Sequence, residues 1–390
     1  DDDTGVNFLL YGATFTGAPR STPEQVAALA RADAPLPDVV AARIDDFIDA
    51  VAAGSRTERI EFARSVLLRN GRDPDTPSGR VNLRSYLAGE VRRGPAETLQ
   101  ISRSLDRALD RSDPDAALLE RTAFRGRGLS SDTAILFDFG IDEALRAAHE
   151  RGLLRAGGIR RMAVVGPGLD FTDKDEGYDI YPIQTVQPFA VIDSLLALGL
   201  TEPGQLQVTA LDLNPRIVRH LEQARARASA GRPYVLALPR NLDLAWSGEL
   251  AAYWERLGAA IGAPAAELDV PPSAGNVQVR TVRVRPEIVL AVKAADLNIV
   301  LQRLAPLQAD ERFDLIVATD ILIYYDTFEQ SLALMNLTRM LSTSGLLLAN
   351  TPVAALPGMP LSAIGHTDVT YMPLAGLGGV RDRFAWYRRR

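Results

Sequence analysis

A glycine turn and three carboxylates, each placed directly after a predicted strand, are the residues of this sequence best suited to hold a ligand. The turn is Gly166-Pro167-Gly168, which ends the apolar run 162–165. Glycine has no Cβ, so the chain can turn sharply there and a ligand can approach the main chain closely. Taken alone, this pattern also fits a plain tight turn. The residues after the later strands therefore decide whether this turn binds a ligand or is only a tight turn.

Two carboxylates are placed to accept hydrogen bonds from a ligand. Asp212 ends the run 208–212, and a carboxylate there can accept two hydrogen bonds from a ribose diol. Its structural alternative is a helix N-cap, but Asn214, directly before Pro215, suits that role and leaves Asp212 for a ligand. Asp296 ends another run and is placed to accept from an exocyclic amine, with an exposed surface acid as the alternative.

The run of residues 313–326 is the strongest indication of a functional site in the sequence. A fully apolar strand leads into Thr319-Asp320 and then into Tyr324-Tyr325 beside an acid. We expect Tyr324 and Tyr325 to shape the pocket of a second substrate, the alternative being that one of them packs into the core. No residue of the sequence is assigned as a general base.

The loop after the glycine turn restricts the class of ligand that the turn could bind. A dinucleotide site needs a third glycine three positions on, at a helix that begins at once. That position is Phe171 here, and Pro182 marks the earliest helix start. A cofactor without a pyrophosphate therefore fits better. The polar loop 170–181, which begins with Asp170, is predicted to be either a lid over the site or a solvated surface excursion.

The elements that must position these residues follow from the hydrophobic pattern. From residue 159 onward, runs typical of strands alternate with runs typical of helices, at 162–165, 186–198, 208–211, 215–228, 288–292, 313–318, 328–341 and 346–349. This alternation predicts an α/β fold: a mostly parallel sheet with helices on both faces, which binds ligands at the carboxyl ends of its strands. Residues 229–285 interrupt it as an insertion, with a helix expected at 246–260 and an edge strand or hairpin at 276–284.

Residues 1–150 carry helical spacing at 23–30, 39–53, 60–68, 99–109 and 133–153. We interpret them as a helical N-terminal region, followed by a ligand-binding domain at 151–390. The helices are expected to cover an active site, to join two copies in a homodimer, or to serve packing alone.

Composition excludes several classes of protein. The 390 residues are 47% hydrophobic and 24% charged, as in an ordinary globular protein. No apolar run reaches the ~18 residues that would predict a membrane span. The net charge of −6 argues against a nucleic-acid partner. Without cysteine there is no thiolate site, and His149, His220 and His366 lack metal-ligand spacing, so we expect no metal. We favour a cytoplasmic location, with export after loss of a signal peptide as the alternative, because the chain starts at Asp1.

With these motifs in order, residues 155–390 resemble the class I S-adenosylmethionine-dependent methyltransferases, and residues 313–326 look most like the corresponding segment of chemotaxis-receptor glutamate methyltransferases. The resemblance implies a Rossmann-like sheet of seven strands and S-adenosyl-L-methionine as the cofactor. The contacts that it implies fall on Gly166, Pro167, Gly168, Asp170, Asp212, Leu213, Asp296, Leu297, Thr319 and Asp320.

The sequence departs from the family's pattern in its spacing. Asp212 lies 44 residues beyond Gly168, Asp296 lies another 84 residues on, and Asp320 replaces the amide of the chemotaxis enzymes. These departures concern the substrate more than the cofactor.

The resemblance implies methyl transfer by in-line displacement, in which positioning supplies much of the rate. The acceptor, a small molecule or a protein, is not identified by the sequence; the acidic loop and the net charge favour a neutral or cationic one. Two alternatives remain: a protein that binds S-adenosylmethionine or S-adenosylhomocysteine without turnover, and a nicotinamide-dependent oxidoreductase, which Phe171 disfavours.

Overall fold

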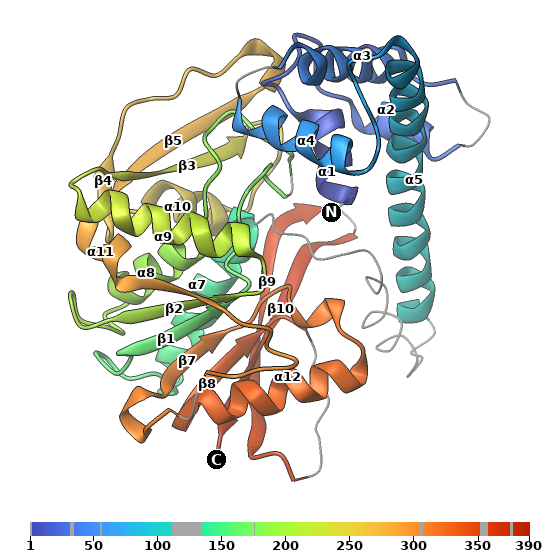
Figure 1. The fold of residues 1–390 in the computed structure, drawn as a ribbon. Helices are drawn as coiled ribbons and strands as arrows, with labels where there is room; N and C mark the ends of the chain where they lie inside the picture. The colour runs from blue at the N-terminus through green and yellow to red at the C-terminus, as the bar shows by residue number, and fades with distance from the viewer. Residues whose placement is uncertain are drawn as a thin grey trace.

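The computed structural model describes residues 2–31, 35–54, 57–110, 134–174, 176–304, 307–351, 358–374 and 377–390. A seven-stranded sheet dominates the part of the chain after residue 160 (Figure 1). Its strands are β1 (Arg161–Val165), β2 (Gln207–Asp212), β6 (Val292–Asp296), β7 (Phe313–Val317), β8 (Leu341–Ala349), β9 (Leu361–Leu374) and β10 (Leu377–Arg389).

The strand order is β6-β2-β1-β7-β8-β10-β9. The first five strands pair in parallel, while β10 is antiparallel to both of its neighbours. The mostly parallel, seven-stranded, Rossmann-like sheet predicted from the sequence is therefore confirmed. From β1 the chain proceeds outward to β2 and β6 and then returns to β7 on the other side of β1. The order reverses between β1 and β7, and a crevice for ligands opens at such a point.

Both faces of the sheet are buried, which explains why its central strands are apolar without alternation. Met162 and Val164 of β1 belong to one core, and Ala163 and Val165 belong to the other. The helices over the first face are α7 (Ile135–Glu150), α8 (Gln187–Ala197), α9 (Pro215–Ser229) and α11 (Pro286–Ala291), and α12 (Thr327–Met340) covers the second. Short 3-10 turns lie at η2 (Ala309–Glu311) and η3 (Leu322–Tyr324).

One strand begins later than its apolar run suggests. Residues 288–292 were expected to form a strand, but Pro286–Ala291 is the helix α11 and β6 starts only at Val292. Proline is preorganised for a first helical turn. As an edge strand, β6 exposes Lys293 and Asp296, so it lacks the apolar run that marks a central strand.

The insertion between β2 and β6 forms a second sheet. Its elements are β3 (Tyr234–Asn241), α10 (Gly248–Arg256), β4 (Gly262–Pro264), η1 (Pro272–Ala274) and β5 (Val277–Val284). The strands are antiparallel in the order β3-β5-β4. The helix within 246–260 and a strand at 276–284 are confirmed. The edge position expected for that strand is wrong, because β5 pairs with β3 on one side and β4 on the other. The strand β3 had not been expected.

The described residues before position 111 form five helices. These are α1 (Asp2–Tyr11), α2 (Pro23–Leu29), α3 (Asp38–Ala53), α4 (Glu58–Arg69) and α5 (Pro77–Asp110), and Figure 1 shows α1 to α4 above the sheet with α5 running down beside it. The later helix α7 instead packs against α8, β9 and β10, so it covers the sheet. No helix in the described ranges is long and apolar enough to cross a membrane.

Most of the loop 170–181 is buried beneath the N-terminal helices. The carboxylate of Asp179 accepts hydrogen bonds from the backbone N–H groups of Ala13, at 2.7 Å, and Thr14, at 3.0 Å. Arg59 of α4 donates to the carbonyl oxygens of Phe171 and Tyr181. The solvated surface excursion considered above is therefore wrong: the loop is a packed layer between the helical region and the sheet.

Candidate functional site

A cavity of about 260 Å³ lies at the carboxyl ends of β2, β1 and β7, at the point where the strand order reverses. The predicted residues that line it are Gly166, Gly168, Asp212, Leu213, Leu297, Thr319, Asp320, Tyr324 and Tyr325. These residues come from four separate stretches of sequence. The sheet brings them together because its parallel strands all end at the same edge.

The glycine turn forms one wall of this cavity. Gly166 and Gly168 have φ angles of 65° and 75°, in the left-handed region that glycine adopts at least cost. A Cβ on Gly166 would stand 3.0 Å from the Cδ1 atom of Ile321, and the Gly166 N–H donates to the carbonyl of Leu211 at 2.9 Å. The turn therefore needs glycine at this position both for its backbone and for close packing.

Asp212 stands at the end of β2, directly across from Asp296 of β6 in the strand register. Its Oδ1 accepts from the backbone N–H of Asn214 at 2.7 Å, while Asn214 caps α9 by accepting from the Arg216 N–H at 3.0 Å. The N-cap role predicted for Asn214 is confirmed. Burial raises the pKa of Asp212 to about 6, backbone hydrogen bonds oppose the rise, and the charge of Asp296 adds to it.

The end of β7 carries two polar contacts. The side chain of Gln187, at the start of α8, donates from Nε2 to the Thr319 hydroxyl at 3.0 Å. Asp320 has a φ of 53°, which is uncommon for a residue with a Cβ and typical of strained functional sites. Asn350 holds it there: its Oδ1 accepts from the Asp320 N–H at 2.8 Å and its Nδ2 donates to Asp320 Oδ1 at 2.7 Å.

Lys174 brings a positive charge to the same end of the cavity. Its Nζ lies 2.8 Å from Asp320 Oδ2 and 4.6 Å from the centre of the Phe137 ring. Lys174 belongs to the loop 170–181, so the loop contributes directly to the cavity wall. Its rarity in the sequence could have drawn attention to Lys174, because Lys174 and Lys293 are the only two lysines of the chain.

Tyr324 and Tyr325 both line the cavity, in and just after the turn η3. Burial raises the pKa of Tyr325 to about 12, and the negative charges of Asp212 and Glu329 add to this effect. Its hydroxyl therefore stays protonated at neutral pH. It can donate a hydrogen bond or shape the wall, but it cannot act as a base.

Three residues predicted to contact the cofactor lie outside the cavity lining: Pro167, Asp170 and Asp296. The carbonyl of Pro167 accepts from the Thr185 hydroxyl at 3.0 Å. Asp170 is buried, and its N–H donates to the carbonyl of Gln184 at 2.8 Å. Asp296 is exposed at the end of its edge strand. Contacts of these residues with a ligand stay sequence-based predictions.

The sequence reasoning did not identify five further lining residues of note: Ala134, Phe137, Lys174, Gln187 and Ile299. The first two belong to the start of α7, which lies far from the glycine turn in sequence, and Gln187 begins α8 after a long loop. No spacing rule connects these positions to the turn, so only the fold brings them to it.

The residues present fit a nucleoside with a polar tail. Leu211, Leu213, Leu297 and Ile299 provide an apolar surface for a base, and Asp212 beside them provides a hydrogen-bond acceptor for a sugar. At the other end, Gln187 Oε1 is buried and has no hydrogen-bond partner within the described chain. Such an atom favours a ligand with a donor at this place. Among the residues that the structure describes, no group of three or more His, Asp or Glu side chains could hold a metal ion.

Two more cavities adjoin the loop 170–181. One, of about 330 Å³, lies under α1, α3, α4 and α5 and is lined by Phe8, Phe47, Phe62, Tyr86 and Phe171; it meets the first cavity at Asn214. The other, of about 250 Å³, lies between the loop and the inserted sheet and includes Asp173, Glu176, Tyr178 and Trp246.

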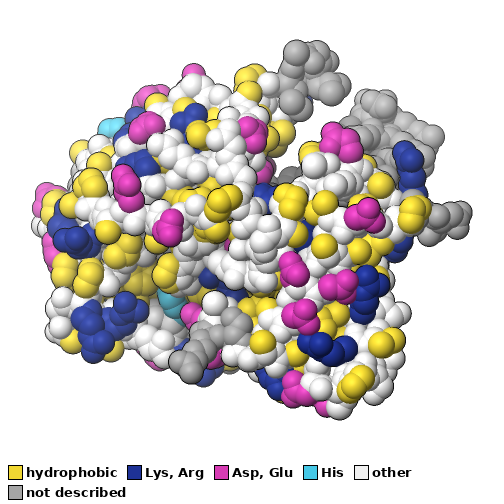
Figure 2. All heavy atoms as spheres, turned by 90° about the horizontal axis from the view of Figure 1, so that it is seen from above, with side chains coloured by type: hydrophobic (Ala, Val, Ile, Leu, Met, Phe, Trp, Pro, Cys, Tyr) yellow, Lys and Arg dark blue, Asp and Glu magenta, His cyan; other side chains and the backbone are white. Residues whose placement is uncertain are grey.

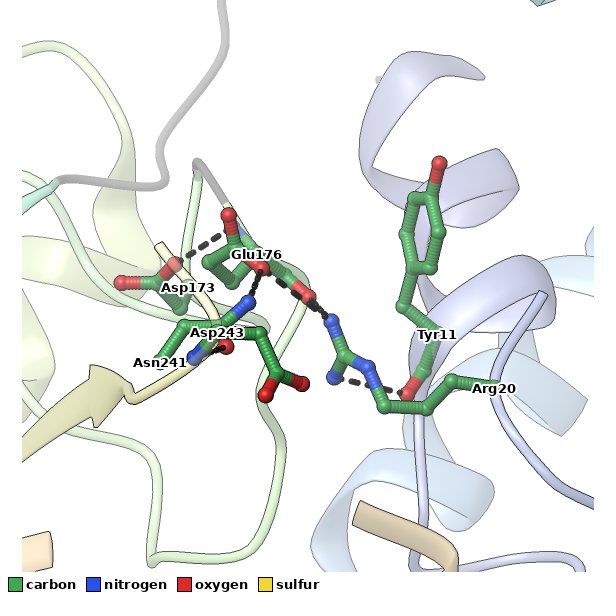
Figure 3. A network of polar contacts seen from close by, with 6 residues as sticks. All are labelled: Tyr11, Arg20, Asp173, Glu176, Asn241 and Asp243. Atoms are coloured by element: carbon green, nitrogen blue, oxygen red, sulfur yellow. Dashed lines mark hydrogen bonds and ion pairs between the residues drawn. The ribbon is translucent and has the colours of Figure 1, made fainter. Parts of the chain in front are cut away.

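Figure 3 shows how three separate regions meet beside this last cavity. Glu176 of the loop accepts from Asn241 of β3 at 2.7 Å and lies 3.6 Å from Arg20 of the N-terminal region. Burial raises the pKa of Glu176, while Asn241 and Arg20 oppose the rise. The loop is thus fixed from both sides.

The face seen in Figure 2 mixes acidic and basic side chains and shows no continuous cationic patch. A nucleic acid would need a dense basic face. This surface and the net charge of −6 give no support for such a partner.

The strand order, with β10 as the antiparallel strand, is that of a Rossmann-like methyltransferase fold. No family model matches the chain. No curated protein matches it either. The chemotaxis-receptor likeness of residues 313–326 is not shown by the comparisons and stays a prediction.

Several methyltransferases are among the solved structures similar to this chain. TrmN from Thermus thermophilus is 14% identical, with 64% of this chain and 52% of that chain covered and a TM-score of 0.29. NodS, an N-methyltransferase from Bradyrhizobium japonicum WM9 in complex with S-adenosylhomocysteine, is 14% identical, with 74% and 98% covered and a TM-score of 0.28. Magnesium protoporphyrin IX methyltransferase (ChlM) from Synechocystis PCC 6803 with bound S-adenosylmethionine is 8% identical, with 66% and 79% covered and a TM-score of 0.30. Superpositions this loose carry no argument about function, which must come from the site.

Proposed function

We propose that the protein binds S-adenosyl-L-methionine and transfers its methyl group to an acceptor. One observation carries the proposal: the cavity at the switch point joins an apolar surface, the carboxylate of Asp212 and a polar end at Gln187, Thr319 and Lys174. Base, sugar and charged tail of the cofactor match these three parts in order.

The assigned parts follow the order of the strands. Leu297 and Ile299, after β6, would contact the adenine, and Asp212 at the end of β2 would accept from the ribose hydroxyls. Gly166 and Gly168 would let the ligand approach the main chain between these positions and β7. Within the lining, Tyr324 and Tyr325 are left for the side on which the acceptor enters.

When bound, the cofactor supplies an electrophilic methyl group on a sulfonium. The protein's contribution is then to orient the two substrates and to exclude water. The buried loop 170–181 closes the cavity on one side, so no large lid movement is needed there. Tyr325 cannot act as a base, and Lys174 and Asp320 neutralise each other at 2.8 Å. The site therefore suits an acceptor that needs little help to lose a proton.

The direct test is the substitution Asp212→Ala. If Asp212 holds the ribose, the affinity for S-adenosylhomocysteine should fall by about 1–3 kcal/mol, which is typical for a buried hydrogen bond to a charged group. Isothermal titration calorimetry measures this change. Asp310→Ala, at the exposed turn η2, is the matched control and should leave the affinity unchanged.

Two results would contradict the proposal. Unchanged affinity in Asp212→Ala would refute the role of that residue. Tight binding of NAD without binding of S-adenosylmethionine or S-adenosylhomocysteine would refute the cofactor. Binding of both sulfur ligands without methyl transfer to any acceptor in a broad panel would instead identify a non-catalytic binding protein.

A further inference from the structure

We propose that Gln187 binds the α-ammonium group at the amino-acid end of the cofactor, and this inference rests on the function proposed above. The carbonyl oxygen of its side chain would accept the hydrogen bond. Gln187 would then act as a specificity residue, which separates ligands with an amino-acid end from nucleosides that lack one.

The first observation is a buried amide that is only half satisfied. Gln187 is 4% exposed, and its Nε2 donates to Thr319 Oγ1 at 3.0 Å. Its Oε1 has no partner among the residues that the structure describes. Buried polar atoms are nearly always hydrogen-bonded, so an unpaired carbonyl oxygen in a cavity wall indicates a ligand with a donor.

The second observation is the position of Gln187 relative to Asp212. The sheet order places β6, β2, β1 and β7 side by side in that sequence. With the base at β6 and the sugar at Asp212 of β2, the rest of the ligand must extend across β1 toward β7. Gln187 is hydrogen-bonded to Thr319, directly beyond β7, so its amide lies where the amino-acid end would arrive.

The third observation concerns charge. The amino-acid end is a zwitterion, and the same part of the cavity holds a charge of each sign, on Lys174 and Asp320. Lys174 can attract the carboxylate, while Gln187 Oε1 and Asp320 provide oxygens for the ammonium. A neutral, rigidly held amide can receive an ammonium without adding a net charge to the buried site.

The test compares two probes: S-adenosylhomocysteine and 5′-methylthioadenosine, which shares the adenosine and the sulfur but lacks the amino-acid end. In Gln187→Met, which keeps the volume but removes both polar atoms, we expect the affinity for S-adenosylhomocysteine to fall at least about tenfold. The affinity for 5′-methylthioadenosine should change by less than about twofold. Titration calorimetry on the full chain measures both.

Asp212→Ala is the matched variant, because loss of a ribose contact should weaken both probes to a similar degree. If Gln187 had only a structural role, Gln187→Met would lower the affinities for both probes equally, and that result would overturn the inference. Unchanged affinities for both probes would also overturn it. Gln187→Leu serves as a second variant if Gln187→Met fails to give a normal thermal melt. If the unaltered protein binds neither probe, the proposed function itself fails; if it binds both and Gln187→Met does not discriminate, only the present inference fails.

Discussion

At the scale of single residues, the proposed role of Asp212 predicts that cofactor binding depends on pH. Burial raises its pKa from the ordinary value to about 6, and hydrogen bonds from ribose hydroxyls favour the ionised form. We therefore expect the affinity for S-adenosylhomocysteine to fall about tenfold from pH 7 to pH 5, as the carboxyl gains its proton. Calorimetry at several pH values checks this, and Asp212→Asn should show a flat profile. A wild-type affinity that does not change with pH would contradict the assignment.

The same residue affects folding in the opposite sense. Because the folded pKa lies above the unfolded one, Asp212 contributes stability that is fully present below the ordinary pKa and is lost as the pH rises through about 6. If a ligand donates hydrogen bonds to the carboxylate as proposed, binding would offset this loss.

At the scale of elements, the loop 170–181 depends on Arg59 of α4, whose buried guanidinium holds the carbonyls of Phe171 and Tyr181. Arg59→Ala would leave these two carbonyls without that donor, and we expect a loss of about 2–4 kcal/mol in the free energy of unfolding. Amide hydrogen exchange in the loop should become faster. Since Lys174 lies in this loop, the affinity for S-adenosylhomocysteine should also fall.

Arg64→Ala on the same helix is the control for this change. Arg64 pairs with Asp75 at 2.6 Å at the exposed surface, where an ion pair contributes about 0–1 kcal/mol. Its exchange pattern in the loop should match that of the unaltered protein. Equal effects of the two substitutions would show that the helix as a whole, and not the Arg59 contact, holds the loop.

At the scale of the whole molecule, ligand binding should stabilise the fold because the cavity is built from strands and helices that are distant in sequence. A ligand at about 100 times its dissociation constant adds about 2.7 kcal/mol to the free energy of unfolding if it binds only the folded state. We expect S-adenosylhomocysteine to raise the midpoint of thermal unfolding, whereas NAD should not. Differential scanning fluorimetry provides the measurement, and an equal shift with both ligands would argue against selectivity for the sulfur cofactor.

The N-terminal helices are part of the same molecule-wide arrangement. Residues of α1, α3, α4 and α5 belong to the core that also contains Phe171 of the loop. They cover the loop and enclose the aromatic cavity beside the proposed site. Their additional role in a homodimer stays a prediction, which sedimentation of the full chain would test.

The sequence by itself determined the succession of the parallel strands β1, β2, β6, β7 and β8 along the chain and much of one wall of the candidate site. Gly166, Gly168, Asp212, Thr319 and Asp320 each lie at the carboxyl end of a strand or just beyond it. The rule that parallel sheets bind ligands at their carboxyl ends was therefore enough to group them. The strand at β6 was placed a few residues early, because an edge strand lacks the apolar run of a central one. Local hydrophobic pattern was therefore sufficient for predictions that depend on one strand and the residues next to it.

Only the tertiary structure decided which residues form the other side of the site. Lys174 and Gln187 come from a loop and a helix start with no distinctive spacing, and they meet Asp320 and Thr319 through long-range packing. The burial of the loop 170–181 was equally hidden, because its polar residues find partners such as Ala13 and Asn241 in regions far apart in sequence. A polar segment is solvated or buried according to whether distant donors and acceptors reach it, and that is a property of the folded chain.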